Sequence, residues 1–251
     1  MSVPPAALVT GGARRIGQAI ARALAEAGYA VAVHANRSVA DAQALCNSIE
    51  AQGGRAAVVR ADLADHDAVL GLVPAAVAAI GPLTLLVNNA GEFEPDTLAT
   101  LQRERFERHI AVDLRAPVFL AQAFAAQLPA GHEGSIVNVT DQRVARPTPN
   151  FFSYTLAKSA LTTATVTMAQ ALAPRVRVNA VAPGPTLPSE RQSADMFARQ
   201  SASVPLGRGP TPEEIAAAVL YLAGARSVTG QTLMVDGGQH VDGRRADGIE
   251  E

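Results

Sequence analysis

A tyrosine and a lysine stand four residues apart in the segment "VTDQRVARPTPNFFSYTLAK", residues 139–158. Because four residues make about one turn of helix, this spacing would place the Tyr154 phenol beside the Lys158 ammonium. Asp141 lies thirteen residues before the tyrosine, at the end of an apolar run typical of a buried strand. A nearby positive charge favours the phenolate and lowers a tyrosine pKa from its ordinary value of about 10. The three residues therefore predict a site that exchanges protons, with Tyr154 as its acid–base group.

A Tyr–Lys pair at this spacing is common on helices that do no chemistry, so its meaning depends on the elements around it. Short apolar runs predict strands at 6–10, 30–35, 55–60, 83–88, 135–140, 175–181 and 232–236. Apolar residues at three-to-four spacing predict helices at 16–27, 39–52, 65–80, 102–128, 153–172 and 211–223. This alternation predicts an α/β fold, a doubly wound parallel sheet with helices on both faces.

The chain of 251 residues contains no repeat or low-complexity linker that would divide it, which favours a single domain, 1–251. One connection, 183–210, is long and contains Pro, Ser and Gly, with a short helix expected inside it. A connection of this length in a compact domain is usually functional, and we predict a substrate lid. The last residues, 241–251, are expected to form a polar tail.

Composition excludes several classes of function. The formal charge is −2, from 21 basic and 23 acidic residues without a long block of one sign, which argues against a nucleic-acid partner. The chain shows neither a secretory signal nor an apolar run long enough to span a membrane.

The single cysteine, Cys46, suits a reducing compartment and is expected to be a packing residue. We therefore expect a soluble, cytoplasmic protein with a small-molecule substrate. The five histidines lack metal-ligand spacing, and no metal site is predicted.

The segment "ALVTGGARRIGQAIARALAEAG", residues 7–28, predicts a strand, a glycine turn and a helix. Such a turn lets the backbone approach a pyrophosphate, which the N–H groups at the helix start then bind. The ordinary dinucleotide fingerprint has a glycine where this chain has Arg14. Glycine turns also begin helices for structural reasons, but the position after the first strand favours nucleotide binding. The predicted contacts here are Gly11, Arg14, Arg15, Ile16 and Gly17.

The end of the second predicted strand, "HANRS" (34–38), indicates which dinucleotide is used. A free ribose hydroxyl calls for an acidic residue near this point, yet none occurs between Val31 and Ala40. Asn36, Arg37 and Ser38 instead offer donors, which suit a phosphate. NADP(H) is thus predicted rather than NAD(H), the alternative being a basic solvated loop.

Further cofactor contacts are predicted at the ends of later strands, each with a structural alternative. Asp62 either bonds the adenine or caps the helix expected near 65. The amides of "VNNAG" are either turn formers or cofactor contacts, and "VAPGPT" either passes close to the nicotinamide or forms an ordinary Pro–Gly turn. The lid residues Met196 and Phe197 either line the pocket or pin the lid. This set comprises Asp62, Leu63, Asn89, Ala90, Gly91, Thr140, Pro183 and Gly184, together with Tyr154 and Lys158.

The motifs "TGGARRIG", "NNAG", "YTLAK", "VAPGPT" and "TGQTLMVDGG" together resemble the short-chain dehydrogenase/reductase family, over nearly the whole chain. The resemblance implies a Rossmann-type sheet of seven strands, a nicotinamide cofactor, hydride transfer and a homotetramer or homodimer. It also implies that Lys158 bonds the nicotinamide ribose. Most members have a serine where this chain has Asp141. The aspartate, the arginine in the glycine turn and "HANRS" resemble the pteridine reductase branch of the family.

That branch implies a substrate site at Arg15, Phe93, Asp141 and Tyr154, with Phe93 facing a pterin ring. Asp141 would relay a proton with Tyr154 to a ring nitrogen, or orient the substrate. An ionised carboxylate would repel the alkoxide of an ordinary ketone, so Asp141, unless it is protonated, disfavours simple ketone reduction. A general carbonyl reductase or alcohol dehydrogenase is the alternative enzyme, and a non-catalytic NADP(H)-binding sensor is the alternative outside catalysis.

The family usually has an asparagine, associated with a water that leads to the lysine, where this chain has Asp113 in "IAVDLRAP". A carboxylate there would either hold the same water or pair with Lys158 or Arg115 and alter its pKa. The role of the family's asparagine is therefore not transferred to this chain.

Overall fold

Seven strands form one parallel sheet in the order β3-β2-β1-β4-β5-β6-β7, in a computed structural model that describes residues 5–242. The strands are β1 (Ala6–Val9), β2 (Ala30–Ala35), β3 (Ala56–Arg60), β4 (Leu85–Asn88), β5 (Gly134–Val139), β6 (Val176–Pro183) and β7 (Thr232–Val235). Each lies where the sequence predicts one, and the predicted fold class is confirmed. Of the predicted polar tail, residues 243–251 lie outside the described part of the chain.

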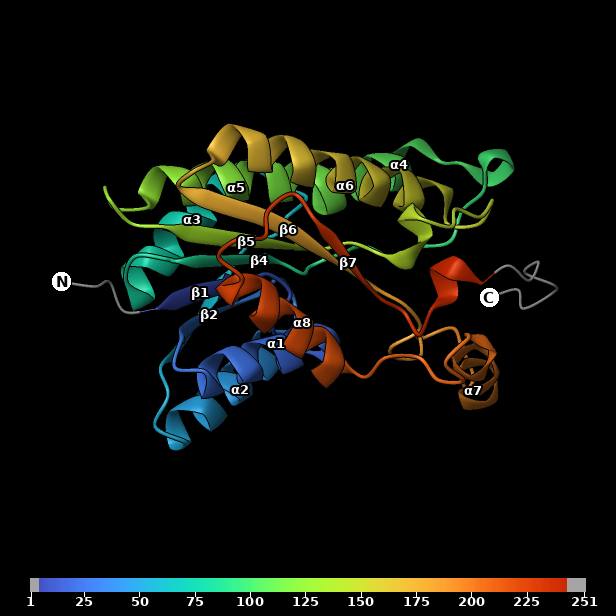
Figure 1. Ribbon diagram of the computed structural model, residues 1–251, viewed down its shortest axis with the longest axis horizontal. Helices are drawn as coiled ribbons and strands as arrows, with labels where there is room; N and C mark the ends of the chain where they lie inside the picture. Colours follow the sequence, from blue (N-terminus) through green and yellow to red (C-terminus); the bar gives the residue numbers. More distant parts are fainter. Residues whose placement is uncertain (1–4, 243–251) are drawn as a thin grey trace.

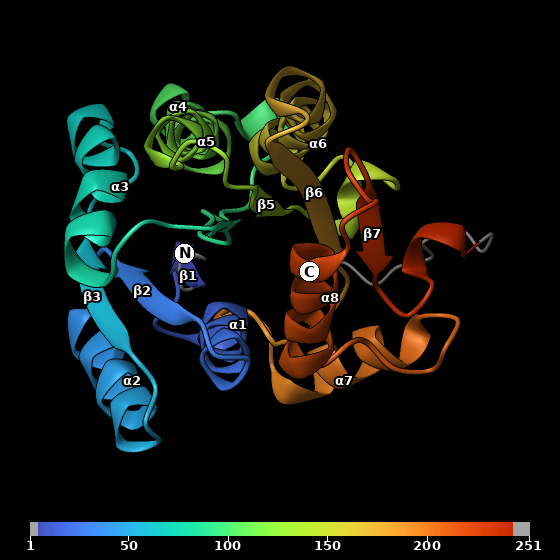
Figure 2. The same cartoon turned by 60° about the vertical axis from the view of Figure 1, so that its left-hand side comes forward.

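Helices cover both faces of the sheet (Figures 1 and 2). One layer holds α1 (Arg15–Glu26), α2 (Val39–Ala51) and α8 (Pro212–Gly224). The other holds α3 (His66–Ile80), α4 (Arg103–His109), α5 (Ala116–Gln127) and α6 (Phe152–Leu172). The short helix α7 (Ala194–Ser203) lies in the connection between β6 and α8 and stands apart from both layers (Figure 1). Short 3-10 turns η1 (Leu98–Thr100), η3 (Gln142–Val144) and η4 (Gln239–Val241) complete the elements.

The strands are apolar on consecutive positions because each face of the sheet has its own core. Leu8 and Leu86 belong to the cluster under α3 and α5, whereas Val9 and Val87, the next residues, belong to the cluster under α1 and α8. Successive side chains of a strand point to opposite faces, so both must be apolar when helices cover both. Cys46 is buried in the second cluster, as predicted for a packing residue.

The predicted single helix 102–128 is wrong in one respect. Between α4 and α5 the chain forms a π-helical segment, η2 (Ile110–Arg115), which widens the helix by an extra residue. Apolar spacing does not reveal such an insertion, because the flanking helices keep their own periodicity. The widened turn contains Asp113, and His109 immediately precedes it. Both side chains are buried, and π segments are frequent at functional sites.

The strand order reverses between β1 and β4, which pair side by side. The connections after these two strands run to opposite sides, so a crevice opens at their carboxyl ends, where ligands bind in open α/β sheets. The glycine turn follows β1, Asn89 follows β4, and Asp141 follows β5 shortly after its end. The fold therefore brings the predicted site residues to one edge of the sheet.

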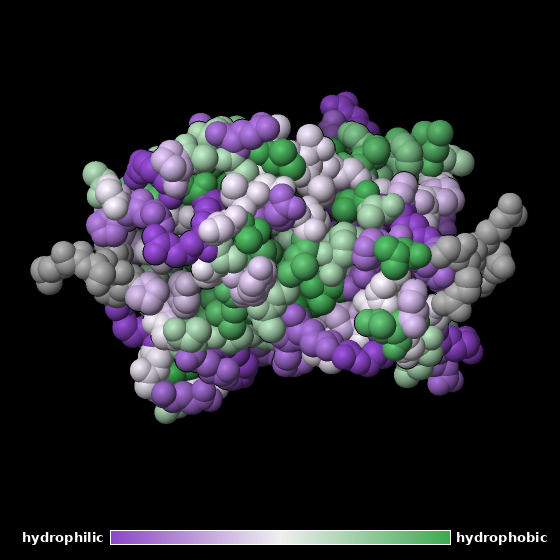
Figure 3. All heavy atoms as spheres, in the orientation of Figure 1, coloured by the Kyte–Doolittle hydropathy of each residue, from purple (hydrophilic) through white to green (hydrophobic). Residues whose placement is uncertain are grey.

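The surface is mixed in character. The face shown in Figure 3 alternates hydrophilic and hydrophobic residues, with hydrophobic ones gathered near its middle, over α8 and β7. Tyr221 of α8 and Leu233 of β7 are exposed large apolar side chains of these two elements. Within residues 5–242, every helix is too short or too polar to cross a membrane.

Candidate active site

A cavity of about 520 Å³ lies at the carboxyl edge of the sheet, within the size range of small-molecule sites. Residues from the glycine turn, the ends of β2, β4, β5 and β6, helix α6 and the lid form its wall. The predicted residues on the wall are Gly11, Arg14, Arg15, Ile16, Gly17, Asn36, Ser38, Asn89, Ala90, Gly91, Phe93, Thr140, Asp141, Tyr154, Lys158, Pro183 and Gly184. Arg37, Asp62 and Leu63 are predicted contacts that do not line it.

These three residues have other surroundings. The Arg37 side chain is exposed, between Asn36 and Ser38, which do line the cavity. Leu63 is buried in the core under α3. Asp62 accepts a hydrogen bond from the Ala64 N–H at 3.0 Å. The alternative that Asp62 caps the next helix is wrong, because Asp65 is the N-cap of α3.

The glycine turn is held by two polar side chains from neighbouring strands. Asn89 Nδ2 donates to the Thr10 and Gly11 carbonyls at 2.9 and 3.1 Å. His34 Nδ1 accepts from the Gly11 N–H at 3.0 Å, and its Nε2 lies 3.1 Å from the Ala61 carbonyl. Burial lowers the pKa of His34, so the ring is neutral and meets one acceptor and one donor. Sequence reasoning missed His34, because its partners come from turns distant in the sequence.

The glycine turn packs so closely on the start of α1 that Gly17 has no room for a side chain. A Cβ on Gly17 would lie 2.1 Å from the Gly11 carbonyl oxygen, so only glycine fits. Arg14 occupies the N-cap of α1 without a side-chain cap bond, and the first turn has no acidic residue. A helix start of this kind binds anions. Arg14 Nε also lies 3.7 Å from the Asp41 carboxylate.

Arg15 joins the glycine turn to the lid. Its φ of 55° lies in the left-handed region, which is strained for a residue other than glycine and is found mostly at functional sites. Its guanidinium donates to the Leu187 carbonyl at 3.4 Å.

Helix α6 presents Tyr154 and Lys158 to the cavity, and its start is fixed by a buried aspartate. Asp96 Oδ1 accepts from the Ser153 N–H at 3.0 Å, and Oδ2 accepts from the Ser153 hydroxyl. Asp96 therefore supplies the cap that Phe151, the N-cap residue, does not provide. Sequence reasoning missed this residue, which lies 57 positions before its partner.

The structure brings the predicted trio together. Tyr154 Oη donates to Asp141 Oδ2 at 3.1 Å, while Asp141 Oδ1 accepts from the Arg143 N–H at 2.8 Å. Lys158 Nζ donates to the Val139 carbonyl at 2.9 Å. The Lys158 nitrogen lies 5.7 Å from the centre of the Tyr154 ring. The arrangement can pass a proton between phenol and carboxylate.

The shift of the Tyr154 pKa is opposite to the one expected from Lys158 alone. Burial, and then the carboxylates of Asp141 and Asp113, raise the pKa of the phenol well above its ordinary value. The expected lowering is offset because the ammonium of Lys158 pairs with Asp113, Nζ to Oδ1 at 3.5 Å. Burial also raises the pKa of Asp141, despite the opposing influence of Arg143. Tyr154 is therefore a phenol, and Asp141 holds a proton more readily than an exposed aspartate.

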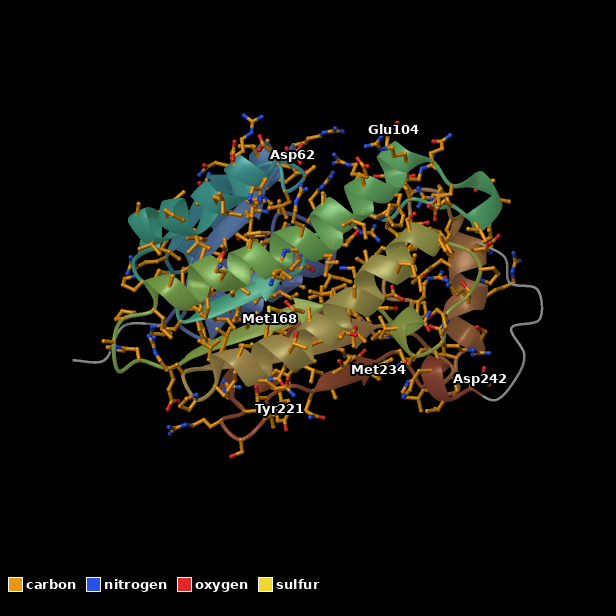
Figure 4. The ribbon with its side chains drawn as sticks, turned by 90° about the horizontal axis from the view of Figure 1, so that it is seen from above. Asp62, Glu104, Met168, Tyr221, Met234 and Asp242 are labelled. Carbon is orange, nitrogen blue, oxygen red and sulfur yellow. The ribbon has the colours of Figure 1, made fainter. Side chains whose placement is uncertain are left out.

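Of the alternatives considered for Asp113, the structure shows the pairing with Lys158. Its Oδ1 faces Lys158 and accepts from the Glu92 N–H at 3.1 Å, and its Oδ2 lies 3.1 Å from His109 Nδ1. Arg115 donates instead to the Ala64 carbonyl at 2.7 Å. Figure 4 shows α5 and α6, the helices that follow and face this turn, running side by side.

The lid meets the loop after β4 through one arginine. Arg191 donates to the Phe93 carbonyl at 2.6 Å and pairs with the Glu94 carboxylate at 3.2 Å. The Phe93 ring stacks on Phe151 with centroids 4.2 Å apart and meets Tyr154 edge-on at 4.8 Å. Met196 and Phe197 do not line the cavity, which the lid reaches through Leu187, Ser189, Gln192 and Gln200. Among residues 5–242, no group of His, Cys, Asp and Glu side chains is placed to hold a metal ion.

The fold and the site define a dinucleotide-binding oxidoreductase of the Tyr–Lys type. A family model described as "Enoyl-(Acyl carrier protein) reductase" matches residues 11–240. An uncharacterized oxidoreductase of Methylorubrum extorquens is 38% identical over 242 residues, 92% of this chain and 96% of the relative. The 3-oxoacyl-[acyl-carrier-protein] reductase FabG of Staphylococcus aureus is 32% identical over 246 residues, 96% of this chain and 100% of the relative.

A solved structure of FolM alternative dihydrofolate reductase 1 from Brucella canis, complexed with NADP, superposes with a TM-score of 0.94. It is 51% identical in sequence and covers 97% of this chain and 96% of its own. The chain belongs to the short-chain dehydrogenase/reductase family, and the predicted resemblance is confirmed.

Proposed function

We propose that the protein is an NADPH-dependent reductase that transfers hydride to a C=N bond of a dihydropterin or a similar flat heterocycle. The observation that carries the proposal is the hydrogen bond from Tyr154 Oη to Asp141 Oδ2 at 3.1 Å. Reduction of C=N leaves a ring nitrogen that must gain a proton, and this pair holds protons at the cavity wall. An ionised carboxylate in the same place opposes the alkoxide that forms when a ketone is reduced.

The cavity residues fit a phosphorylated dinucleotide. The uncapped start of α1 suits the pyrophosphate, and Gly17 lets the glycine turn pack closely on that helix start, since a Cβ there would meet the Gly11 carbonyl oxygen. Arg14, Asn36 and Ser38 offer donors at the end of the cavity near β2, where a 2′-phosphate would lie. The relative from Brucella canis was crystallised with NADP. When bound, this cofactor supplies the hydride.

The side chains of this protein would then divide the remaining work. Lys158 would bond the nicotinamide ribose from its position at Val139. Tyr154 would give its proton to the substrate nitrogen, and the Asp141 carboxylate, whose raised pKa helps it to take up a proton from water, would then return one to Tyr154. Phe93 and Arg15, both on the cavity wall, would hold the flat ring. Residues 183–210 would act as the lid that excludes water.

Similarity to FolM alternative dihydrofolate reductase 1 supports the substrate class, because dihydrofolate contains a dihydropterin ring. The second candidate is a general carbonyl reductase or alcohol dehydrogenase, which the similarity to a 3-oxoacyl reductase favours. Asp141 argues against it for the reason given above. A non-catalytic NADP(H)-binding sensor has no use for a Tyr154–Lys158 pair at the cavity.

We also infer a cytoplasmic homotetramer without a nucleic-acid partner. Two exposed apolar areas support the assembly. One lies on α6, where Leu156 and Val166 are exposed, and the other on α8 and β7, around Tyr221 and Leu233 (Figure 3). Sedimentation equilibrium measures the assembly directly, and a monomer at micromolar concentration would contradict it.

The test of function is the initial rate of NADPH oxidation, and of NADH beside it, with dihydrobiopterin, dihydrofolate and a panel of ketones and quinones. Turnover of a pterin with NADPH is the expected result. Turnover of ketones alone would remove the pterin assignment while leaving the Tyr154 chemistry. If no substrate is turned over while NADPH still binds, the result would favour the NADP(H)-binding sensor.

A further inference from the structure

The Asp113 carboxylate faces the Lys158 ammonium and is completely buried. Its two oxygens meet donors from three separate segments. Oδ1 faces Lys158 Nζ at 3.5 Å and accepts from the Glu92 N–H, and Oδ2 lies 3.1 Å from His109 Nδ1. A buried carboxylate so surrounded has one orientation, and with it Lys158 has one partner of opposite charge.

His109 completes this arrangement. Its side chain is also fully buried, and its Nδ1 must carry the hydrogen that meets the Asp113 carboxylate. Its other nitrogen, Nε2, has no hydrogen-bond partner within the described chain. Gly91 leaves the space that the carboxylate needs, since a Cβ there would lie 2.9 Å from Asp113 Oδ1. Three separate segments thus surround the Asp113 carboxylate: α6 with Lys158, α4 with His109 and the loop with Gly91 and Glu92.

We propose that Asp113, oriented by His109, is a positioning residue for Tyr154 and Lys158. Its carboxylate holds the Lys158 ammonium by a direct ion pair and keeps Tyr154 in its phenol form. The asparagine usual in this family is neutral and does neither. The consequence rests on the proposed function, because the phenol is the form that gives a proton when a C=N bond is reduced.

The charges around Tyr154 explain the effect. The groups that face it are Asp141 after β5, Arg143 on η3, Lys158 on α6, Asp113 on η2 and the His109 ring, whose centre lies 6.1 Å from that of Tyr154. After burial and Asp141, the charge of Asp113 is the next cause that raises the Tyr154 pKa. Replacing this carboxylate by an amide removes the negative charge and leaves Lys158 without its ionic partner, and both changes favour the phenolate.

The test is a direct titration of Tyr154. The chain has three tyrosines and no tryptophan, so tyrosinate absorbance in the near ultraviolet is read without interference. Subtracting the titration of the Tyr154→Phe counterpart isolates Tyr154 in each background. We expect Asp113→Asn to move the Tyr154 ionisation to lower pH by about one unit or more, the usual effect of a close charge.

His109 supplies a matched pair of variants. His109→Asn keeps an N–H close to the place of Nδ1 and should titrate like the unsubstituted protein. His109→Leu removes the N–H that holds Asp113 Oδ2, so the carboxylate is no longer held in this orientation and the Tyr154 ionisation should move toward that of Asp113→Asn. If Asp113→Asn does not fold, the Tyr154 titrations of these two His109 variants test the same proposal.

An unchanged Tyr154 titration in Asp113→Asn, with a native circular dichroism spectrum, would overturn the proposal, as would identical titrations of the two His109 variants. The titration requires no substrate. Its failure is therefore distinct from a failure of pterin turnover, which would bear on the proposed function alone.

Discussion

Tyr154 is the residue that we propose as the proton donor, and two carboxylates and two basic side chains face it. Asp141 accepts its hydrogen bond, and the charge of Asp113 raises the Tyr154 pKa. Lys158 pairs with Asp113 and donates to the Val139 carbonyl. Tyr154 therefore stays protonated and can give its proton to a substrate. This differs from the simple expectation that a neighbouring lysine makes the phenolate.

Replacing Tyr154 with phenylalanine tests its role as proton donor. Tyr154→Phe should lower kcat for pterin reduction by about 100-fold or more, the usual contribution of general acid catalysis. Equilibrium binding of NADPH, followed by its fluorescence, should change little. Tyr221→Phe, at an exposed position on α8, is the matched control and should leave both quantities unchanged. Full turnover by Tyr154→Phe would remove Tyr154 from the mechanism.

We predict that Arg14, rather than Arg37, gives the protein its selectivity for NADPH. Arg14 lines the cavity, whereas Arg37 is exposed and does not. Arg14→Ala should weaken NADPH binding by about tenfold or more, because a bond to a charged group contributes about 1.5–3 kcal/mol. NADH binding should change much less. Isothermal titration of both cofactors against both alanine variants decides the point, and an Arg37 effect larger than the Arg14 effect would contradict it.

At the scale of elements, the start of α6 sets the position of Tyr154. Asp96 makes two hydrogen bonds to Ser153, the residue before the tyrosine, from a loop on another part of the chain. The left-handed backbone of Phe151 turns the chain into the helix just before this point. The helix start is therefore held from outside, and its position depends on the loop after β4.

Removing this cap should cost both stability and activity. Asp96→Ala loses an N-cap and leaves a buried hydroxyl without its partner, which should destabilise the fold by about 1–3 kcal/mol. It should also lower kcat. Asp65→Ala removes the exposed cap of α3, which is not on the cavity wall, and should cost about 1 kcal/mol without a change in kcat. Chemical denaturation and steady-state kinetics of both variants separate the two effects, and equal kcat values would refute a positioning role for Asp96.

The elements show what the sequence is able to reveal. The strands and most helices follow from local patterns, because burial on both faces of the sheet leaves a continuous apolar run. The glycine turn and the Tyr154–Lys158 spacing are equally local. His34 and Asp96 are not, since each acts on a backbone group brought near only by folding. The π turn that holds Asp113 also escaped prediction, because one inserted residue leaves the apolar spacing on either side intact.

At the scale of the whole molecule, two cores fix the sheet, and the chemistry lies at its carboxyl edge. The clusters on the two faces make the sheet a rigid platform, and the cavity opens where the strand order reverses. The side of this cavity formed by the glycine turn suits a cofactor. The side formed by Phe93, Asp141 and the lid differs from the serine pattern usual in the family. We therefore expect these few residues, on a widely used fold, to set the substrate.

The central claim is that Asp141 selects a C=N heterocycle over a ketone. The most direct measurement is the ratio of kcat/KM for a dihydropterin to that for a small ketone, with NADPH, in the unsubstituted protein and in Asp141→Ser. The serine variant should lower this ratio, because it loses the carboxylate that exchanges a proton with Tyr154 and gains a hydroxyl that accommodates an alkoxide. An equal ratio in the two proteins would contradict the claim and leave Asp141 without a part in substrate choice.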